Sequence, residues 1–319
     1  MTTLWWEHIG RDIVTAAHVS TRAADSQEAP VRHPDGAAVN SRLREGIHMI
    51  MVLVVLLLLG VPGLGGAAEL PIVDAHVHYS HDAWSVVTPK EAVATLRTAG
   101  VKKALVSSSP NEGTQKLLAE APDLIVPGLR PYRKRGELST WMKDPEALRY
   151  VEDQLPKQRW VSIGEFHING AEVDLPIPRR IVELAKQHGL FLQAHSDAEA
   201  VERIFKQDAG ARVLWAHAGF APVEKVREMM RKHKGLWADL ALRSEVGSGG
   251  RVNPEWRQVF VEFPDRFMVG TDTWTPSRWH DIVGHAAFSR AWLADLPTDL
   301  AERIAWKNAE ALFVTAARR

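Results

Sequence analysis

The residues best suited to chemistry in this 319-residue chain begin with two histidines, His76 and His78, which are separated by a single residue. They end an apolar segment, 71–78, whose composition is typical of a β-strand. In a strand, residues two apart point to the same face, so both imidazoles can approach one point in space. Imidazole is the commonest metal-ligating side chain. The spacing therefore indicates a metal site at the end of the first strand.

Four further ionisable residues stand at the ends of later apolar segments. Each lies close to a glycine or alanine that leaves room for it, and the four are Glu165, His195, His217 and Asp272. Together with the histidine pair they offer four imidazoles and two carboxylates. Such a nitrogen and oxygen ligand set suits Zn²⁺, and also Mn²⁺, Fe²⁺ or Co²⁺. We therefore predict one or two divalent metal ions, with zinc as the expected metal.

These residues need a scaffold that brings five strand ends to one place, and the chain beyond residue 68 predicts one. Eight short apolar segments alternate there with amphipathic stretches; they are 71–78, 102–108, 124–130, 161–168, 190–196, 212–218, 236–242 and 266–272. Strand followed by helix, repeated eight times, gives parallel strands with right-handed crossovers. Residues 69–319 number 251, close to the ~250 of a closed barrel. We predict an α/β fold, a single (β/α)₈ TIM barrel with its site at the C-terminal strand ends.

Helix boundaries support the same fold. Thr88-Pro89-Lys90-Glu91 predicts a capping box with proline at the first helical position. The stretch 176–189 carries an apolar stripe and ends in a glycine, which is typical of a helix C-terminus. An open, doubly wound sheet is the structural alternative. It would usually place a glycine-rich turn after the first strand, where this chain has His76-Val77-His78-Tyr79.

The first 68 residues lie outside this pattern. Two arginines precede an unbroken apolar run, 49–59, and a Gly- and Pro-containing stretch ends in Gly66-Ala67-Ala68. A basic flank, a short apolar core and small closing residues predict a secretory signal peptide over 48–68. We expect an exported barrel domain, 69–319, periplasmic or secreted, with an uncleaved membrane anchor as the alternative. Residues 1–47 are polar and aperiodic, and we interpret them as disordered or as the product of a misassigned start.

Composition narrows the classes of partner. The 39 basic and 39 acidic side chains balance, so charge gives no reason to expect a nucleic-acid partner. The chain has no cysteine, which excludes disulfides, thiolate ligands and a cysteine nucleophile. The expected partner is a small-molecule substrate, with membrane contact only through the N-terminal segment.

Other residues are candidates for contact with that substrate. Arg130 ends the third strand segment and could hold a carboxylate, although a salt bridge is the simpler interpretation. His167 shares the face of Glu165 and could line the pocket or be structural. Asp74 lies deeper than the histidine pair, so we expect it to support the ligands. Three tryptophans are placed in loops above the barrel, where they could form an apolar wall: Trp84, Trp274 and Trp279.

With these residues in place, the chain resembles the amidohydrolase superfamily of metal-dependent barrels, specifically its amidohydrolase-related branch. The resemblance covers 71–314, including the closing Lys307-Asn308-Ala309-Glu310-Ala311-Leu312-Phe313. It implies two metal positions that share a bridging ligand. The first metal would be held by His76, His78 and Asp272, the second by His195 and His217, and the bridge would be Glu165.

The activity implied is hydrolysis of an amide, ester or lactone bond by a metal-activated water. Asp272 would take the proton of the water and pass it to the leaving group, with His217 as the second catalytic residue. Two alternatives stay open. One is a non-oxidative decarboxylase of an aromatic or unsaturated acid, which some members of this branch are, with one metal. The other is a non-catalytic exported binding barrel. A bridging Glu165 favours two metals and hydrolysis.

Overall fold

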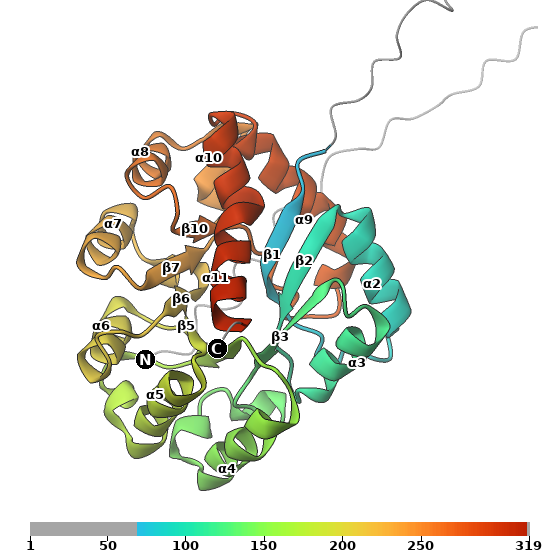
Figure 1. Ribbon diagram of the computed structural model, residues 1–319. Helices are drawn as coiled ribbons and strands as arrows, with labels where there is room; N and C mark the ends of the chain where they lie inside the picture. Colours follow the sequence, from blue (N-terminus) through green and yellow to red (C-terminus); the bar gives the residue numbers. More distant parts are fainter. Residues whose placement is uncertain (1–68, 318–319) are drawn as a thin grey trace, which may run out of the picture. The chain divides into compact units, whose positions relative to one another are not determined.

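The computed structural model describes residues 69–317, which form a barrel of parallel strands surrounded by helices (Figure 1). Each strand pairs in parallel with the next in chain order: β1 (Ile72–Val77), β2 (Val101–Val106), β3 (Ile125–Leu129), β4 (Ser162–His167), β5 (Phe191–His195), β6 (Val213–Trp215), β7 (Leu236–Asp239) and β10 (Phe267–Met268). The Ala75 N–H donates to the Val269 carbonyl at 2.9 Å, which joins the last strand to the first. The predicted (β/α)₈ barrel is confirmed.

Helices cover the outside of the strands. The α-helices are α2 (Pro89–Thr98), α3 (Glu112–Glu120), α4 (Pro145–Gln154), α5 (Pro176–His188), α6 (Ala198–Gln207), α7 (Val223–Lys232), α8 (Pro254–Glu262), α9 (Arg278–Leu293), α10 (Thr298–Glu302) and α11 (Asn308–Ala317). Short 3₁₀ turns and one π turn join them: η1 (Arg135–Glu137), η2 (Trp141–Lys143), η3 (Leu155–Lys157), η4 (Gly170–Asp174), η5 (Ala216–Phe220), η6 (Ser244–Val246) and η7 (Arg303–Lys307). A small antiparallel pair, β8 (Gly247–Ser248) and β9 (Arg251–Val252), lies between β7 and α8.

The helix ends follow the signals in the sequence. Thr88 and Glu91 form the predicted capping box at the start of α2, where the Thr88 hydroxyl accepts from the Glu91 N–H. Gly189 ends α5 with a φ of +65°, a left-handed conformation that glycine adopts without steric cost. These local signals fix where α2 begins and where α5 ends.

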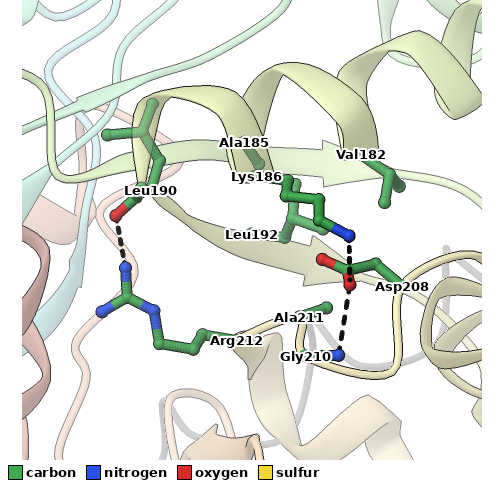
Figure 2. A pocket seen from close by; sticks show the side chains of 10 residues that line it. Val182, Ala185, Lys186, Leu190, Leu192, Asp208, Gly210, Ala211 and Arg212 are labelled. Atoms are coloured by element: carbon green, nitrogen blue, oxygen red, sulfur yellow. Dashed lines mark hydrogen bonds and ion pairs between the residues drawn. The ribbon is translucent and has the colours of Figure 1, made fainter.

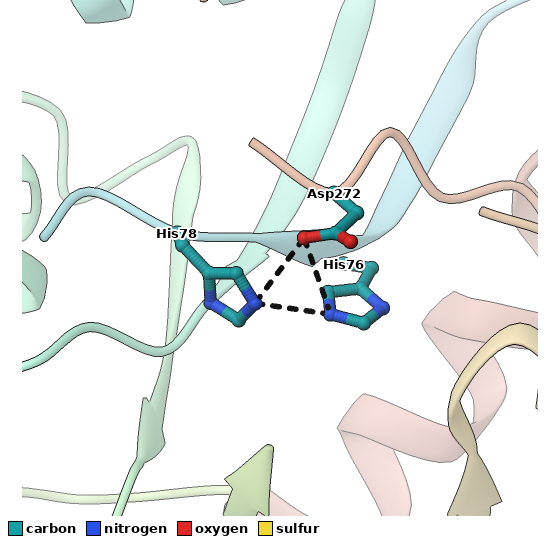
Figure 3. A group of neighbouring side chains, drawn as sticks. All are labelled: His76, His78 and Asp272. Atoms are coloured by element: carbon teal, nitrogen blue, oxygen red, sulfur yellow. Dashed lines mark hydrogen bonds and ion pairs between the residues drawn. The ribbon is translucent and has the colours of Figure 1, made fainter. Parts of the chain in front are cut away.

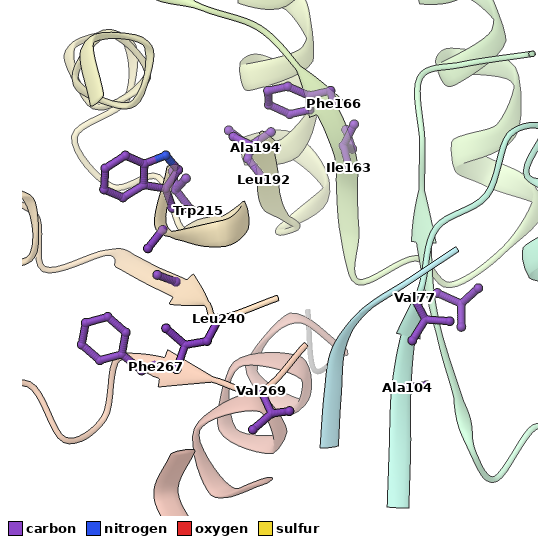
Figure 4. Packing of buried hydrophobic residues seen from close by; sticks show 14 of the residues in the cluster. Val77, Ala104, Ile163, Phe166, Leu192, Ala194, Trp215, Leu240, Phe267 and Val269 are labelled. Carbon is purple, nitrogen blue, oxygen red and sulfur yellow. The ribbon is translucent and has the colours of Figure 1, made fainter. Parts of the chain in front are cut away.

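Two apolar clusters hold the barrel together. The larger one fills the layer between strands and helices, with Ile163, Trp215 and Phe267 among its fully buried members (Figure 4). The smaller one joins side chains from strands all around the barrel to the last helix; its members are Val73, Ala75, Leu105, Val161, Phe191, Leu214, Met268, Ala309, Leu312, Phe313 and Ala316. Side chains from strands so far apart can meet only inside the barrel. Helix α11 therefore covers its N-terminal end, where Figure 1 shows it lying across the strands.

The predictions for the first 68 residues, the signal peptide over 48–68 and the segment 1–47, concern residues outside those that the structure describes. Within residues 69–317, no helix is both long enough and apolar enough to cross a membrane.

Candidate metal centre

His76, in β1, and His78, directly after β1, lie at the centre of the site. The Nε2 atoms of His76 and His78 lie 3.1 Å apart, so both rings point at one spot, as the spacing predicts. Asp272 follows β10 and turns its Oδ1 towards the same spot, 3.8 Å from His76 Nε2 and 3.4 Å from His78 Nε2 (Figure 3). All three side chains are buried.

Glu165, from β4, reaches the centre of the site. Its Oε1 lies 2.9 Å from His195 Nδ1, 3.4 Å from His76 Nε2 and 3.6 Å from His217 Nε2. Its Oε2 lies 3.1 Å from His78 Nε2. The structure thus brings together all six residues that the sequence singles out, which lie in or just after strands β1, β4, β5, β6 and β10.

The chemistry of this donor set fits a divalent cation. Among the described residues, His217 Nε2 and Asp272 Oδ1 are buried without a hydrogen-bond partner. Three groups of side chains each place their ligand atoms within 4.8 Å of one another: His76, His78 and Asp272; His76, Glu165 and His217; and Glu165, His167 and His195. Buried nitrogen and oxygen atoms that converge without protein partners are what a cation would satisfy. The cluster supports divalent-metal binding.

Hydrogen bonds behind the site orient three of the histidines. His76 Nδ1 lies 3.1 Å from Asp239 Oδ2, and His217 Nδ1 lies 3.0 Å from the Ala241 carbonyl. His78 Nδ1 faces the Ser107 carbonyl. An acceptor at Nδ1 keeps the proton there and leaves the Nε2 lone pair directed into the centre. His195 differs, because its Nδ1 faces Glu165.

Asp239 is a site residue that the sequence interpretation missed. It is fully buried at the end of β7, and its Oδ1 also accepts from the backbone N–H groups of His217 and Ala241 at 3.1 Å each. One signal could have revealed it. Asp239 is the only charged residue in the segment 236–242, and an acid within a buried apolar strand needs a partner.

The carboxylates and imidazoles of the site shift each other's pKa values. Burial opposes ionisation of Glu165, yet His167, His76 and Arg130 hold its pKa well below the ordinary range. Burial by itself would lower the pKa of His76, but Asp239, Asp272 and Glu165 raise it well above its usual value. The site therefore concentrates negative charge that favours a cation at its centre.

Asp74 has the supporting position expected of it. Its Oδ1 accepts from the N–H groups of His76 and Thr271, at 3.0 and 3.1 Å, and its Oδ2 accepts from the Thr271 hydroxyl at 2.6 Å. Burial raises the pKa of Asp74 to about 6. These bonds join β1 to the segment after β10 and so set the separation of the histidine pair and Asp272.

Arg130 and His167 lie at the site but face protein partners. Arg130 is buried; its Nη2 donates to Glu165 Oε2 at 2.6 Å and its Nε to the Glu165 carbonyl at 3.1 Å. Its guanidinium thus holds the central carboxylate, where the sequence interpretation considered a substrate carboxylate or a salt bridge. The His167 ring stacks on His195 at 4.1 Å, and its Nδ1 lies 3.1 Å from the Tyr132 hydroxyl.

The three tryptophans predicted to lie in loops above the barrel differ in where the structure places them. Trp274 lies two residues beyond Asp272 and is 44% exposed. Trp279 is not in a loop above the barrel, and that prediction is wrong. It lies within α9, is buried, and packs edge-to-face on Tyr79 at 5.5 Å. Trp84 is part-buried and donates its indole N–H to the Tyr79 carbonyl at 3.0 Å.

The backbone around the site is unusual. Consecutive residues from His217 to Phe220 all have positive φ, between 47° and 63°, and so do Leu242 and Asp272. A left-handed conformation is rare outside glycine, and such residues cluster at functional sites. The turn after β6 folds back, so that the Phe220 ring stacks on His217 at 4.7 Å.

A surface hollow between α5 and the loop before β6 lies at the opposite end of the strands (Figure 2). Gly189 and Leu190 precede β5, Arg212 precedes β6, and the Lys186–Asp208 ion pair at 3.1 Å spans the hollow. In barrels of this kind the N-terminal end of the strands contributes stability, and activity belongs to the other end. The hollow is therefore no part of the metal centre.

Comparisons with known proteins agree with the barrel fold. The family model described as amidohydrolase matches residues 144–314. No match was found among curated proteins. Among solved structures, the chain is similar to an uncharacterised TIM-barrel protein, Bb4693, from Bordetella bronchiseptica, at 14% identity and a TM-score of 0.56, covering 78% of this chain and 100% of that one.

Two further structures show the same fold. One is a putative 2-pyrone-4,6-dicarboxylic acid hydrolase from Pseudomonas putida, 14% identical, TM-score 0.52, covering 77% of this chain and 98% of that one. The other is YJJV, a TatD homolog from Escherichia coli K12, 17% identical, TM-score 0.52, covering 77% and 99%. The matched segment spans more than half of the chain and contains four of the six clustered residues. The chain therefore belongs to the amidohydrolase family of metal-dependent TIM-barrel hydrolases.

Proposed function

We propose that this protein is a metal-dependent hydrolase that cleaves an amide, ester or lactone bond of a small molecule. The observation that carries the proposal is the position of Glu165. One of its oxygens lies within 3.6 Å of His76, His195 and His217, and the other lies 3.1 Å from His78. A single carboxylate between two groups of imidazoles suits the bridge of a two-metal site, with His76, His78 and Asp272 on one side and His195 and His217 on the other.

The residues divide the chemistry among them. When bound, divalent ions, with zinc expected, would lower the pKa of a water and polarise the carbonyl under attack. Asp272, whose Oδ1 has no hydrogen-bond partner among the described residues, would accept the proton of that water and return it to the leaving group. His217 faces the same space through its Nε2, 3.8 Å from Asp272 Oδ2. Arg130 would keep Glu165 ionised and in place.

Two substitutions separate the roles of the carboxylates. Glu165→Gln keeps the size but removes the charge, so we expect metal analysis to find about one ion per chain instead of two, with activity largely lost. Asp272→Asn should keep most of the metal, because the histidines remain, and should lower kcat by at least ~10²-fold through loss of the proton acceptor. Glu120→Gln, at the exposed end of α3, is the control and should retain both metal and activity.

Metal analysis and a screen of esters, lactones and amides are the measurements. One ion per chain in the native protein, release of CO₂ from an aromatic or unsaturated acid, and an unaffected Glu165→Gln variant would together favour the decarboxylase. Turnover of any substrate that depends on the metal would exclude a purely binding barrel.

A further inference from the structure

Three exposed apolar side chains lie at the mouth of the barrel, all on one side of the metal centre. Phe220 follows β6 and is 51% exposed, Leu242 follows β7 and is 40% exposed, and Trp274 follows β10 and is 44% exposed. These three strands are consecutive neighbours in the sheet. We call the three residues the apolar rim.

The apolar rim lies next to the site residues. The Phe220 ring stacks on His217 at 4.7 Å and lies 5.8 Å from the His195 ring. Leu242 directly follows Ala241, whose carbonyl faces His217 Nδ1 at 3.0 Å. Exposed apolar groups held beside buried polar ones are typical of a ligand site, since a bound apolar group would remove them from water.

Two residues of the apolar rim have a backbone conformation that is locally unfavourable. Phe220 and Leu242 both have positive φ, 50° and 59°, which side chains larger than glycine rarely adopt. Strain of this kind persists where the surrounding structure imposes it, most often at functional sites. The two residues therefore have a conformation that exposes their side chains at the mouth although it is locally unfavourable.

Three arginines near the metal centre direct their donors at the protein itself. Arg130 donates to Glu165. Arg243 donates to the carbonyls of His217 and Ala221, at 3.0 and 2.9 Å. Arg278 donates to the carbonyls of Thr271 and Asp272. A substrate carboxylate would have to compete for guanidinium groups that already serve the backbone and the central glutamate.

We infer that the substrate carries an uncharged aromatic or bulky aliphatic group, which packs on Phe220, Leu242 and Trp274 while the scissile carbonyl lies at the metal centre. This inference rests on the proposed hydrolase function, and it names the substrate class. It separates this chain from a hydrolase of a dicarboxylic acid, whose substrate would need cationic partners at the mouth.

Three hydroxamates test the inference by calorimetry on the zinc-loaded protein, independently of turnover. All three carry the same metal-binding group: acetohydroxamate has a methyl tail, benzohydroxamate has a phenyl ring, and 4-carboxybenzohydroxamate has the same ring with a carboxylate. We expect benzohydroxamate to bind about tenfold more tightly than acetohydroxamate, the gain from burying part of an aromatic ring. The carboxylate should remove most of that gain.

Variants assign the preference to the apolar rim. Phe220→Ala, and separately Trp274→Ala, should reduce the ratio of the affinities for benzohydroxamate and acetohydroxamate several-fold. Phe288→Ala is the matched control, because Phe288 is 43% exposed on α9 and no site residue contacts it among the interactions described. It should retain the full preference.

The outcomes distinguish the two levels of the proposal. Equal affinity for the methyl and phenyl probes, or tighter binding of the carboxylated probe, would overturn the inference while the hydrolase remained. A native protein that binds none of the three probes would lack an accessible metal site, and the proposed function would fail together with the inference. A preference that survives in both rim variants would show that the ring binds elsewhere.

Discussion

Asp239 determines which nitrogen of His76 faces the metal centre. Its Oδ2 lies 3.1 Å from His76 Nδ1, and a carboxylate oxygen can only accept a proton in a hydrogen bond. The proton of the neutral imidazole is therefore held at Nδ1, and the Nε2 lone pair is left for a cation. The same side chain accepts from the His217 N–H, so one carboxylate orients the residues of two strands.

Asp239→Asn should weaken metal binding by roughly 10- to 100-fold, the usual effect of losing such a support. The amide of the new residue keeps the size, but its NH₂ group would face His76 Nδ1 and favour the tautomer with the proton on Nε2. Zinc titration by calorimetry measures the change. Asp265→Asn is the control, since Asp265 is exposed just before β10. Equal zinc affinity in the two variants would remove Asp239 from the site.

At the scale of elements, the turn after β6 shapes the site. The residues from His217 to Phe220 are all left-handed, which reverses the chain within one turn and brings Phe220 over His217. Gly219 makes this possible. An added Cβ there would lie 2.1 Å from Cζ2 of Trp215, a side chain that is completely buried.

Gly219→Ala should destabilise the fold by at least about 2 kcal/mol, because a left-handed alanine costs ~1–2 kcal/mol and overpacking adds ~1–3 kcal/mol. Zinc affinity should fall as well, since His217 belongs to the same turn. Gly249→Ala is a close control: Gly249 has a similar φ of +56°, but no atom lies within 4 Å of the added Cβ. Denaturant unfolding and zinc titration of both variants test this. Equal losses of stability in the two variants would mean that the left-handed backbone conformation, and not the close approach to Trp215, causes the destabilisation.

The order of the elements could be predicted from the sequence because each is coded locally. Each predicted strand segment overlaps one observed strand, even β10, which has two residues. The apolar run of a strand and the cap of a helix need no information from elsewhere in the chain. The six clustered residues followed from their places at the strand ends, since a barrel brings those ends together.

The remaining features depend on contacts between distant segments. Nothing near Arg130 indicates that its partner is Glu165, 35 residues further on. Trp279 was predicted to lie in a loop, because the sequence of α9 shows no clear helical period. Helix α9 carries apolar residues on its exposed side as well, Val283 and Phe288 among them, and these obscure the period. The left-handed turn at His217 contains a single glycine, so no local signal marks the residues beside it.

At the scale of the whole barrel, the last helix takes part in the core. Phe313 of α11 is buried and stacks on Phe191 of β5 at 6.0 Å, inside the cluster that fills the N-terminal end. Helix and strands therefore stabilise each other across the barrel axis. The metal centre lies at the opposite strand ends, so the two regions can be changed separately.

Phe313→Ala should cost about 3–5 kcal/mol of folding free energy, as large-to-small changes of buried phenylalanine do. Zinc affinity of the folded protein should stay within about twofold, because none of the hydrogen bonds, ion pairs and ring contacts described for the site residues involves α11. Val314→Ala, one residue further and 46% exposed, should change stability by less than ~0.5 kcal/mol. A Phe313→Ala variant as stable as the native protein would mean that α11 lies on the barrel without supporting it.

The covering of one end by α11 also has a kinetic consequence. In the part of the chain that the structure describes, an apolar plug fills the barrel beneath the site. On the proposed function, ions, substrate and products would then all enter and leave at the opposite end of the barrel, beside the apolar rim. A product that dissociates slowly would delay the next substrate, and a bound substrate would slow the exchange of the metal. The apolar rim that we propose for substrate binding would therefore also influence the rate of product release.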